Sequence, residues 1–346
     1  MAIPKTHEGD IFNRALSRVG DSRLVLEAEK TVTGITAANP PVVSVAAHGY
    51  ANGDKVLLYD LTGGAELNGR VFEIGSVAAG TFALYRETGV GYTAATAGFC
   101  RKLPATKAAR TVFDAWARIR DEIIRAHPWN SVVRRTRLAR LEAAKTITGA
   151  SPFAGATTIS VAAHGYSDGD LVLIDGIGGM TEINGRYYPV TVVSAATFTI
   201  PVDSSTYTPY ALPGTARKVL PPLRPDFGYD CVYDLPEDCE RVLELADDPD
   251  YGWETEGRQV VTDLGPTVPI RYARKITDPD LFDAQLTTVL VARLASEISE
   301  ELTQSNTKKE ALRKDFEDLI SEAKRLDAQE QSGQDFAEDD WVNARL

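Results

Sequence analysis

The sequence predicts an α+β protein: a helical bundle with a small antiparallel sheet, carrying two inserted all-β, barrel-like modules. Two observations support this fold class. Apolar residues recur at three- and four-residue steps in several segments, which indicates amphipathic helices. A β-rich segment also occurs twice, with VAAHGY at 45–50 and again at 161–166. The helical segments lie before, between and after the two copies, so the copies look like insertions into a host chain.

The repeat is a duplication without gaps. His48 recurs as His164, a shift of 116 residues, and the same shift holds from Val45 to Leu103. Each copy contains short runs of β-branched and aromatic residues between Gly, Asn and Asp, and its Asn-Gly pair (68–69, 184–185) is typical of a hairpin turn. These runs predict strands at 56–59, 71–74 and 81–85 in the first copy, and at 171–174, 187–193 and 197–202 in the second.

The segment between the copies, Arg110 to Ala139, begins as a helix with one apolar stripe. Pro128 should end this helix, because the residue before a proline is disfavoured in the α region. A basic run follows it, made of Arg134, Arg135, Arg137 and Arg140.

Three more helices are predicted in the host. The first runs from Asp10, as its N-cap, to Val19, and Gly20 closes it. Near the C-terminus, Asp278 should cap a second helix with Pro279 in its first turn, and Thr307 should open a third. The short connection makes the last two an antiparallel pair. The small antiparallel sheet is expected from the runs at 242–245, 252–263 and 269–276.

This organisation predicts a discontinuous adaptor core and three other parts. The core comprises residues 1–29, 104–141 and 220–331; the modules are 30–103 and 142–219; and 332–346 forms a polar, acidic arm.

Composition excludes several classes of protein. A net charge of −12 argues against a nucleic-acid binder held by a global positive field. The three cysteines form no even-numbered disulfide framework and no CxxC pair. No run reaches the roughly 18 apolar residues of a membrane helix. We therefore expect a protein without a membrane segment, made in a cytosol-like compartment.

Three host segments together resemble the tail tubular protein A family, the head-to-tail adaptors of short-tailed phages. They are RDEIIRAHPWN (120–130), YDLPEDCERV (233–242), and the DPDLFD segment (278–283) with its ARLA helix (292–295). The resemblance covers essentially all of the host, about half of the chain. The two modules depart from that pattern, and they are similar to the small β-module in the first catalytic-cysteine half-domain of ubiquitin-activating enzymes. No ubiquitin chemistry accompanies this second similarity, because the chain has neither an adenylating motif nor a positioned catalytic cysteine.

The resemblance implies a structural virion protein rather than an enzyme, with no cofactor. It implies a homo-oligomeric ring of twelve copies at the head–tail junction, between the portal ring and the tail nozzle protein, made in the host cytoplasm. DNA would pass through the lumen without sequence-specific binding. By hypothesis, the modules form an outer collar that contacts tail fibres.

Candidate contacts to partner proteins are two tryptophans and four arginines: Trp129, Arg134, Arg135, Arg137, Trp341 and Arg345. For each tryptophan, local packing is an equally good interpretation. The arginines following Pro128 suit either an acidic neighbouring protein or DNA, and we favour the protein because phosphate contacts in the lumen would hinder sliding.

The alternative function is a cell-surface glycan-binding or glycan-cleaving tail protein that acts through the modules. Its candidate sugar-stacking residues are Tyr50, Tyr166, Tyr187 and Tyr188. Cleavage is disfavoured because no carboxylate pair stands out among many. His48 and His164 are expected to be structural, since one His per copy is too few for a metal site.

Overall fold

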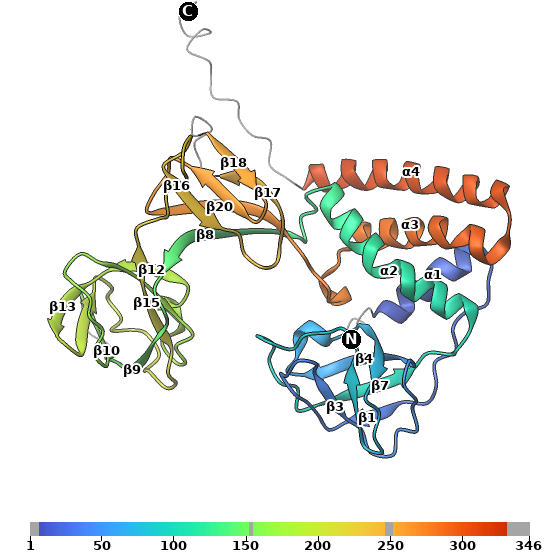
Figure 1. Ribbon diagram of the computed structural model, residues 1–346, viewed down its shortest axis with the longest axis horizontal. Coiled ribbons are helices and arrows are strands. Elements are labelled where there is room, and N and C mark those ends of the chain that lie inside the picture. The colour runs from blue at the N-terminus through green and yellow to red at the C-terminus, as the bar shows by residue number, and fades with distance from the viewer. Residues whose placement is uncertain (1–6, 152–154, 246–251, 331–346) are drawn as a thin grey trace, which may run out of the picture. The chain divides into compact units, whose positions relative to one another are not determined.

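The computed structural model describes residues 7–151, 155–245 and 252–330. Within them the protein combines four α-helices with antiparallel sheets, which confirms a mixed α and β fold (Figure 1). The chain divides into two compact units, Met1–Val133 with Ala273–Leu346, and Arg134–Tyr272. The predicted host core is therefore divided. Its helices have their core in unit 1, and its small sheet has a separate core in unit 2.

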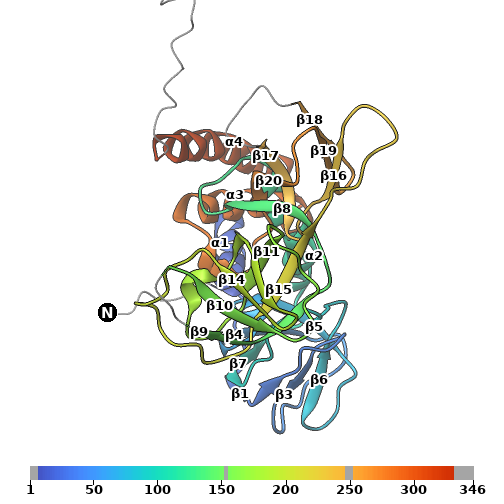
Figure 2. The same ribbon diagram turned by 90° about the vertical axis from the view of Figure 1, so that its left-hand side faces the viewer.

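Unit 1 contains the helices, and α3 packs against the other three (Figures 1 and 2). Their apolar stripes meet in one core that includes Phe12, Trp116 and Leu290. The helices are α1 (Glu8–Val19), α2 (Lys107–Ala126), α3 (Ala284–Thr303) and α4 (Asn306–Gln329).

Two predicted helix ends are confirmed. α2 stops at Ala126, two residues before Pro128, as the restriction on residues preceding proline predicts. Gly20 ends α1 in the left-handed conformation with φ 77°, which glycine adopts without a steric penalty.

Two predicted helix starts are wrong by a few residues. α1 is capped by His7, whose side chain accepts a hydrogen bond from the amide of Asp10. Asp278 caps only a short 3-10 turn, and α3 begins after Asp283, whose carboxylate accepts from the amide of Leu286 at 2.7 Å. The helix therefore starts five residues later than predicted, because Pro279 begins only a 3-10 turn.

Module 1 in unit 1 is a nearly closed seven-stranded sheet in the order β1-β7-β4-β5-β6-β3-β2. The two ends of the order approach each other where Ile35 and Ala95 exchange backbone hydrogen bonds of 2.8 and 3.1 Å. The strands are β1 (Lys30–Val32), β2 (Gly34–Ile35), β3 (Val42–Ser44), β4 (Lys55–Thr62), β5 (Val71–Gly75), β6 (Thr81–Leu84) and β7 (Ala97–Lys102).

Unit 2 contains module 2 and the small sheet. The basic run after Pro128 is strand β8, which the sequence did not predict, and β8 joins β15 of the module to β20. The small sheet expected from the sequence is divided: β20 and β17 continue the ten-stranded sheet of the module, and β16, β19 and β18 form a separate three-stranded sheet. Module 2 comprises β9 (Lys145–Ser151), β10 (Thr157–Val161), β11 (Leu171–Asp175), β12 (Arg186–Pro189), β13 (Thr191–Ser194), β14 (Thr197–Ile200) and β15 (Thr215–Leu220). The other strands are β8 (Val133–Leu141), β16 (Cys231–Asp234), β17 (Cys239–Leu245), β18 (Trp253–Glu256), β19 (Gln259–Thr262) and β20 (Thr267–Arg274).

The two histidines hold the same structural position in each copy. The Nδ1 of His48 accepts from the amide of Tyr50 at 3.0 Å, and its Nε2 lies 2.7 Å from a backbone carbonyl oxygen. His164 repeats both contacts, at 3.0 Å to the amide of Tyr166 and 2.8 Å to a carbonyl oxygen. Each ring therefore has a structural role, because it bonds to two backbone groups beside the glycine turn, as expected.

One difference between the copies lies in their cores. The hydroxyl of Tyr50 lies 3.6 Å from the Sγ of Cys100. Ala216 occupies the position of Cys100 in the second copy, and the buried hydroxyl of Tyr166 has no hydrogen-bond partner among the described residues.

This difference predicts opposite effects of one substitution in the two copies. Tyr166→Phe should leave the free energy of unfolding unchanged or raise it by about 1 kcal/mol, because an unsatisfied buried hydroxyl is removed. Tyr50→Phe should lower it by about 0.5 kcal/mol, because a weak bond is lost. Urea unfolding of both variants measures this, and equal losses in the two would contradict the assignment.

Candidate functional site

The segment His127 to Asn130 is tied to the last turn of α4 by one buried carboxylate. Asp327 is 5% exposed; its carboxylate lies 2.8 Å from the Nε2 of His127 and accepts from the amide of Asn130 at 3.0 Å. The Asn130 side chain donates to the carbonyl of Asp327 at 3.1 Å and to the carboxylate of Glu330 at 3.0 Å. We call these residues the HPWN junction.

Trp129 fills the inside of this junction. It is fully buried, its indole N–H donates to the carbonyl of Ile123 at 3.0 Å, and its ring meets His127 edge-on at 4.7 Å. Of the two interpretations of Trp129, partner contact or local packing, the structure supports local packing: after α2 stops at Ala126, the indole lies in the core of unit 1.

The next residues connect the junction to the start of α3. The hydroxyl of Ser131 donates to the Asp283 carboxylate at 2.8 Å, and the amide of Arg274 donates to the carbonyl of Val132 at 2.9 Å. Asp283 belongs to the DPDLFD segment and Trp129 to RAHPWN. Two of the three segments that carry the phage-adaptor resemblance thus meet in one place.

The third segment, YDLPEDCERV, lies in unit 2, where its side chains bond to residues of other strands. The Asp238 carboxylate accepts from the hydroxyl of Tyr272 at 3.0 Å and lies 3.7 Å from the guanidinium of Arg134. Tyr233 donates to the carbonyl of Leu264 at 3.0 Å, and Cys239 is buried in the same core.

The four arginines of β8 are exposed, and the three candidates among them differ in their contacts. Arg134 pairs with Asp238, and the guanidinium of Arg137 donates to the hydroxyl of Thr267 at 3.0 Å. For Arg135 the described residues supply neither an ion pair nor a hydrogen bond. Among the three candidates, Arg135 is therefore the one whose side chain has no polar contact within the described residues. The other two candidate contacts, Trp341 and Arg345, lie outside the described residues.

The tyrosines predicted to stack on sugars are largely inside the modules. Tyr50 and Tyr166 are 6% exposed and Tyr188 is 9% exposed, so the prediction of a sugar platform is wrong for these three. Their rings serve the module cores beside Phe82 in the first copy and Phe198 in the second. Tyr187 is half-buried, and its hydroxyl donates to the carbonyl of Arg137 at 3.3 Å.

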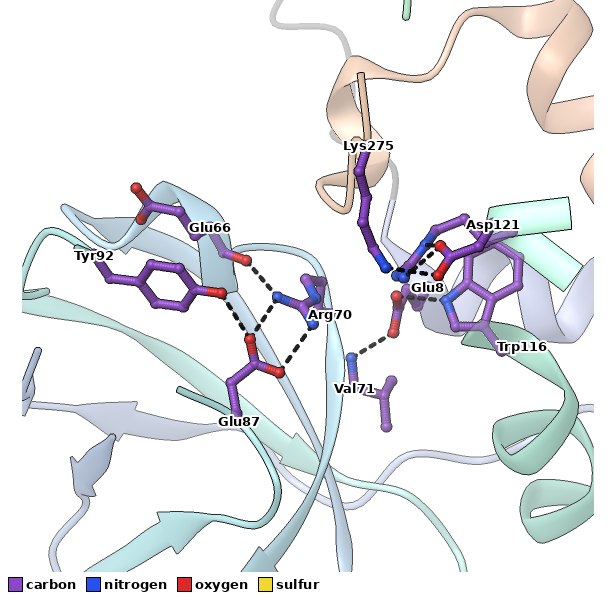
Figure 3. Close-up of polar contacts among 10 residues, drawn as sticks. Glu8, Glu66, Arg70, Val71, Glu87, Tyr92, Trp116, Asp121 and Lys275 are labelled. Carbon is purple, nitrogen blue, oxygen red and sulfur yellow. Dashed lines mark hydrogen bonds and ion pairs between the residues drawn. The ribbon is translucent and has the colours of Figure 1, made fainter. Parts of the chain in front are cut away.

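A contact that the sequence did not predict fastens module 1 to the helices. Glu8 is 2% exposed, and its amide donates to the carbonyl of Gly69 at 2.8 Å. Its carboxylate accepts from the amide of Val71 at 2.6 Å and from the indole of Trp116 at 2.5 Å (Figure 3). We call this the Glu8 clip. Glu8 is one of many acidic residues in the sequence, and only the tertiary fold distinguishes it.

Burial raises the pKa of Glu8, and the neighbouring Arg70 and Arg120 oppose that rise. Each of these two arginines also forms an ion pair with a carboxylate other than that of Glu8. Arg70 lies 3.2 Å from Glu87, and Arg120 lies 2.9 Å from Asp121. The arrangement is typical of a structural contact, because each charge is held by fixed partners inside one unit (Figure 3).

The described residues contain no group of three or more His, Cys, Asp or Glu side chains arranged to hold a metal ion. Among those same residues, none of the helices has the length and apolar character needed to cross a bilayer.

Removing the carboxylate of the HPWN junction should destabilise unit 1. Asp327→Ala leaves the amide of Asn130 and the His127 ring unsatisfied, so the free energy of unfolding should fall by about 2–4 kcal/mol. Asp327→Asn keeps one acceptor and should lose less. Denaturant unfolding measures the effect, with the exposed Asp318→Ala as the matched control, expected within about 0.5 kcal/mol of wild type. Equal stability of Asp327→Ala and the control would refute the role of Asp327.

The Glu8 clip should give stability a recognisable pH dependence. Because the pKa of Glu8 is raised above 4.5, the folded state binds the proton more tightly than the unfolded chain. This contribution to stability grows as the pH falls through the raised pKa, and it is lost as the pH rises. Relative to Glu8→Gln, the wild type should therefore gain stability as the pH falls from neutral toward the ordinary glutamate value of 4.5.

Unfolding by denaturant at several pH values measures this difference. Glu310→Gln, an exposed position on α4, should show no comparable trend. A wild-type advantage that grows toward high pH would have the wrong sign and would contradict a raised pKa.

Comparison with known proteins identifies one part of the chain. Residues 156–219 match the family model described as the ubiquitin-activating enzyme E1 FCCH domain, a non-catalytic part of those enzymes. Comparison with curated proteins finds no match. The matched stretch covers most of module 2 and less than half of the chain. Module 2 is therefore similar to an FCCH domain, and module 1 shares that similarity through the internal repeat.

Proposed function

We propose that this protein is the head-to-tail adaptor of a short-tailed phage. It forms a ring between the portal and the tail nozzle, with DNA passing through the centre. In this proposal the four helices make the body of the ring as a bundle, and the two barrel-like modules decorate it as an outer collar. The protein acts by joining two rings and not by catalysis.

The observation that carries the proposal is the convergence of the resembling segments. The motifs RAHPWN and DPDLFD are far apart in the sequence, yet they meet through Ser131 and Asp283. Asp327 of α4 completes the same junction. Motif residues that hold one another in place support common descent with a whole fold more strongly than scattered matches do.

The HPWN junction also suits an adaptor that presents its C-terminal arm. Asn130 binds Glu330, and the acidic segment 331–346 begins immediately afterwards. Glu330, the residue before this segment, is thus bonded to the chain that follows α2. A segment that becomes ordered on a partner binds more tightly when the residue before it is held in place, because less conformational entropy of the chain is lost on binding.

Arg135 is the residue through which we propose contact with an acidic neighbouring protein. It is exposed on β8, while Arg134 and Arg137 have contacts within their own unit. DNA in the lumen remains the competing partner for this side chain.

Mixing the purified protein with purified portal rings tests the function. We expect negative-stain images to show a second ring stacked coaxially on the portal. Arg135→Glu should abolish stacking through charge repulsion, and Arg224→Glu, an exposed arginine elsewhere in unit 2, should not. Absence of any complex with the portal would overturn the proposal. Normal stacking of Arg135→Glu with loss of DNA retention in virions would assign Arg135 to the lumen.

The glycan-binding alternative has no specific support in the fold. Three of its four tyrosines are buried, and the fourth is engaged with β8.

A further inference from the structure

The outer edge of β5 is covered in module 1, whereas the edge of the equivalent strand β12 is open in module 2. In module 1, the carbonyl of Gly69 and the amide of Val71 both bond to Glu8, and these two residues are buried. The equivalent residues in module 2 are Gly185, which is exposed, and Tyr187, which is half-buried.

The backbone groups at this edge point outward in both copies. The register Leu173↔Tyr187 repeats the register Leu57↔Val71, so the amide of Tyr187 faces away from β11 as that of Val71 faces away from β4. Within the described residues β12 pairs only with β11. An outward donor at Tyr187 and an outward acceptor at Gly185 are the groups with which an added extended segment pairs.

The charge at the edge also differs between the copies. In module 1, Arg70 is neutralised by Glu87 at 3.2 Å. Its equivalent Arg186 is exposed, and Asp203, in the place of Glu87, instead accepts from the amide and hydroxyl of Ser205 at 3.0 and 2.6 Å. No described carboxylate lies within ion-pair distance of Arg186. Module 2 thus lacks both carboxylates that serve this edge in module 1.

We propose that the module 2 edge, made of Gly185, Arg186 and Tyr187, binds the acidic C-terminal segment 331–346 of a second copy. Glu8 shows the chemistry that the edge accepts: a carboxylate on the outward amide, followed by an aromatic residue, Phe12, that packs on the helices. The C-terminal segment offers carboxylates next to aromatic side chains at Asp335, Phe336, Glu338, Asp339, Asp340 and Trp341.

We choose a second copy of the chain as the binding partner of this edge because the same contact can then repeat from one subunit to the next. Each chain carries such a segment and such an edge, so the contact is head-to-tail, the type that builds a ring when the rotation between neighbours closes. This inference rests on the proposed function, since it names the contact that would link neighbouring subunits. The carboxylates of the segment complement the charge of Arg186.

Site-specific photo-crosslinking in the full-length chain tests the contact. A photoreactive amino acid replaces Tyr187, and chains of natural and ¹⁵N isotope content are mixed before irradiation. We expect cross-linked peptides that join position 187 to residues 331–346, with mixed isotope content. The same probe at Val193, which is exposed on β13 of the same module, is the matched control and should not capture that segment.

Two charge variants sharpen the test. Neutralising the segment with Glu338→Gln, Asp339→Asn and Asp340→Asn should reduce the cross-link yield about tenfold, and Arg186→Gln should also reduce it. Three results would overturn the inference. They are cross-links only within single chains, cross-links from position 187 to residues outside 331–346, and an unchanged yield with the neutralised segment. Rings on the portal without this cross-link would overturn the contact and keep the proposed function. The cross-link without portal binding would keep the contact and overturn the proposed function.

Discussion

Unit 1 depends on buried carboxylates that join segments far apart in the chain. Glu8 connects the first helix to module 1 and to α2, and Asp327 connects the last helix to the exit of α2. Each carboxylate receives donors that would otherwise be buried without a partner. Removing one leaves several polar groups unsatisfied, which costs more than the bonds themselves contribute. The helices are therefore held by polar cross-links as well as by the apolar core around α3.

The duplication is informative because the two copies experience different surroundings. Their cores agree closely: the His–Tyr brace and the buried Phe recur with nearly the same geometry. Their outer faces have diverged according to what each must contact. Module 1 presents Leu57 and Val71 to the helices, where both are buried. The same face of module 2 carries Leu173 and Tyr187 and remains partly open.

Much of the secondary structure follows from local patterns. Pro128 ends α2, Gly20 ends α1, and the Asn-Gly pairs mark corresponding turns in both modules. Errors arose where two local signals competed or where pairing was distant. Asp278 was predicted to cap the long helix, but it caps a 3-10 turn, and Asp283 caps α3. Strand β8 was missed because its arginines conceal the alternation, and its pairing with β15 and β20 depends on residues roughly 80 to 140 positions away.

By itself the sequence determined the duplication, the all-β character of the copies, the helical segments between them and the resemblance of the host motifs. These properties follow from periodicity and from residue identities at fixed spacing, which are local. Only the tertiary structure decided which polar residues matter. It placed Trp129 and three of the four candidate tyrosines inside cores, selected Glu8 and Asp327 from many acidic residues, and left Arg135 and the module 2 edge available. The physical reason is that burial and partner geometry are set by long-range packing, so a side chain's chemistry becomes specific only when distant segments surround it.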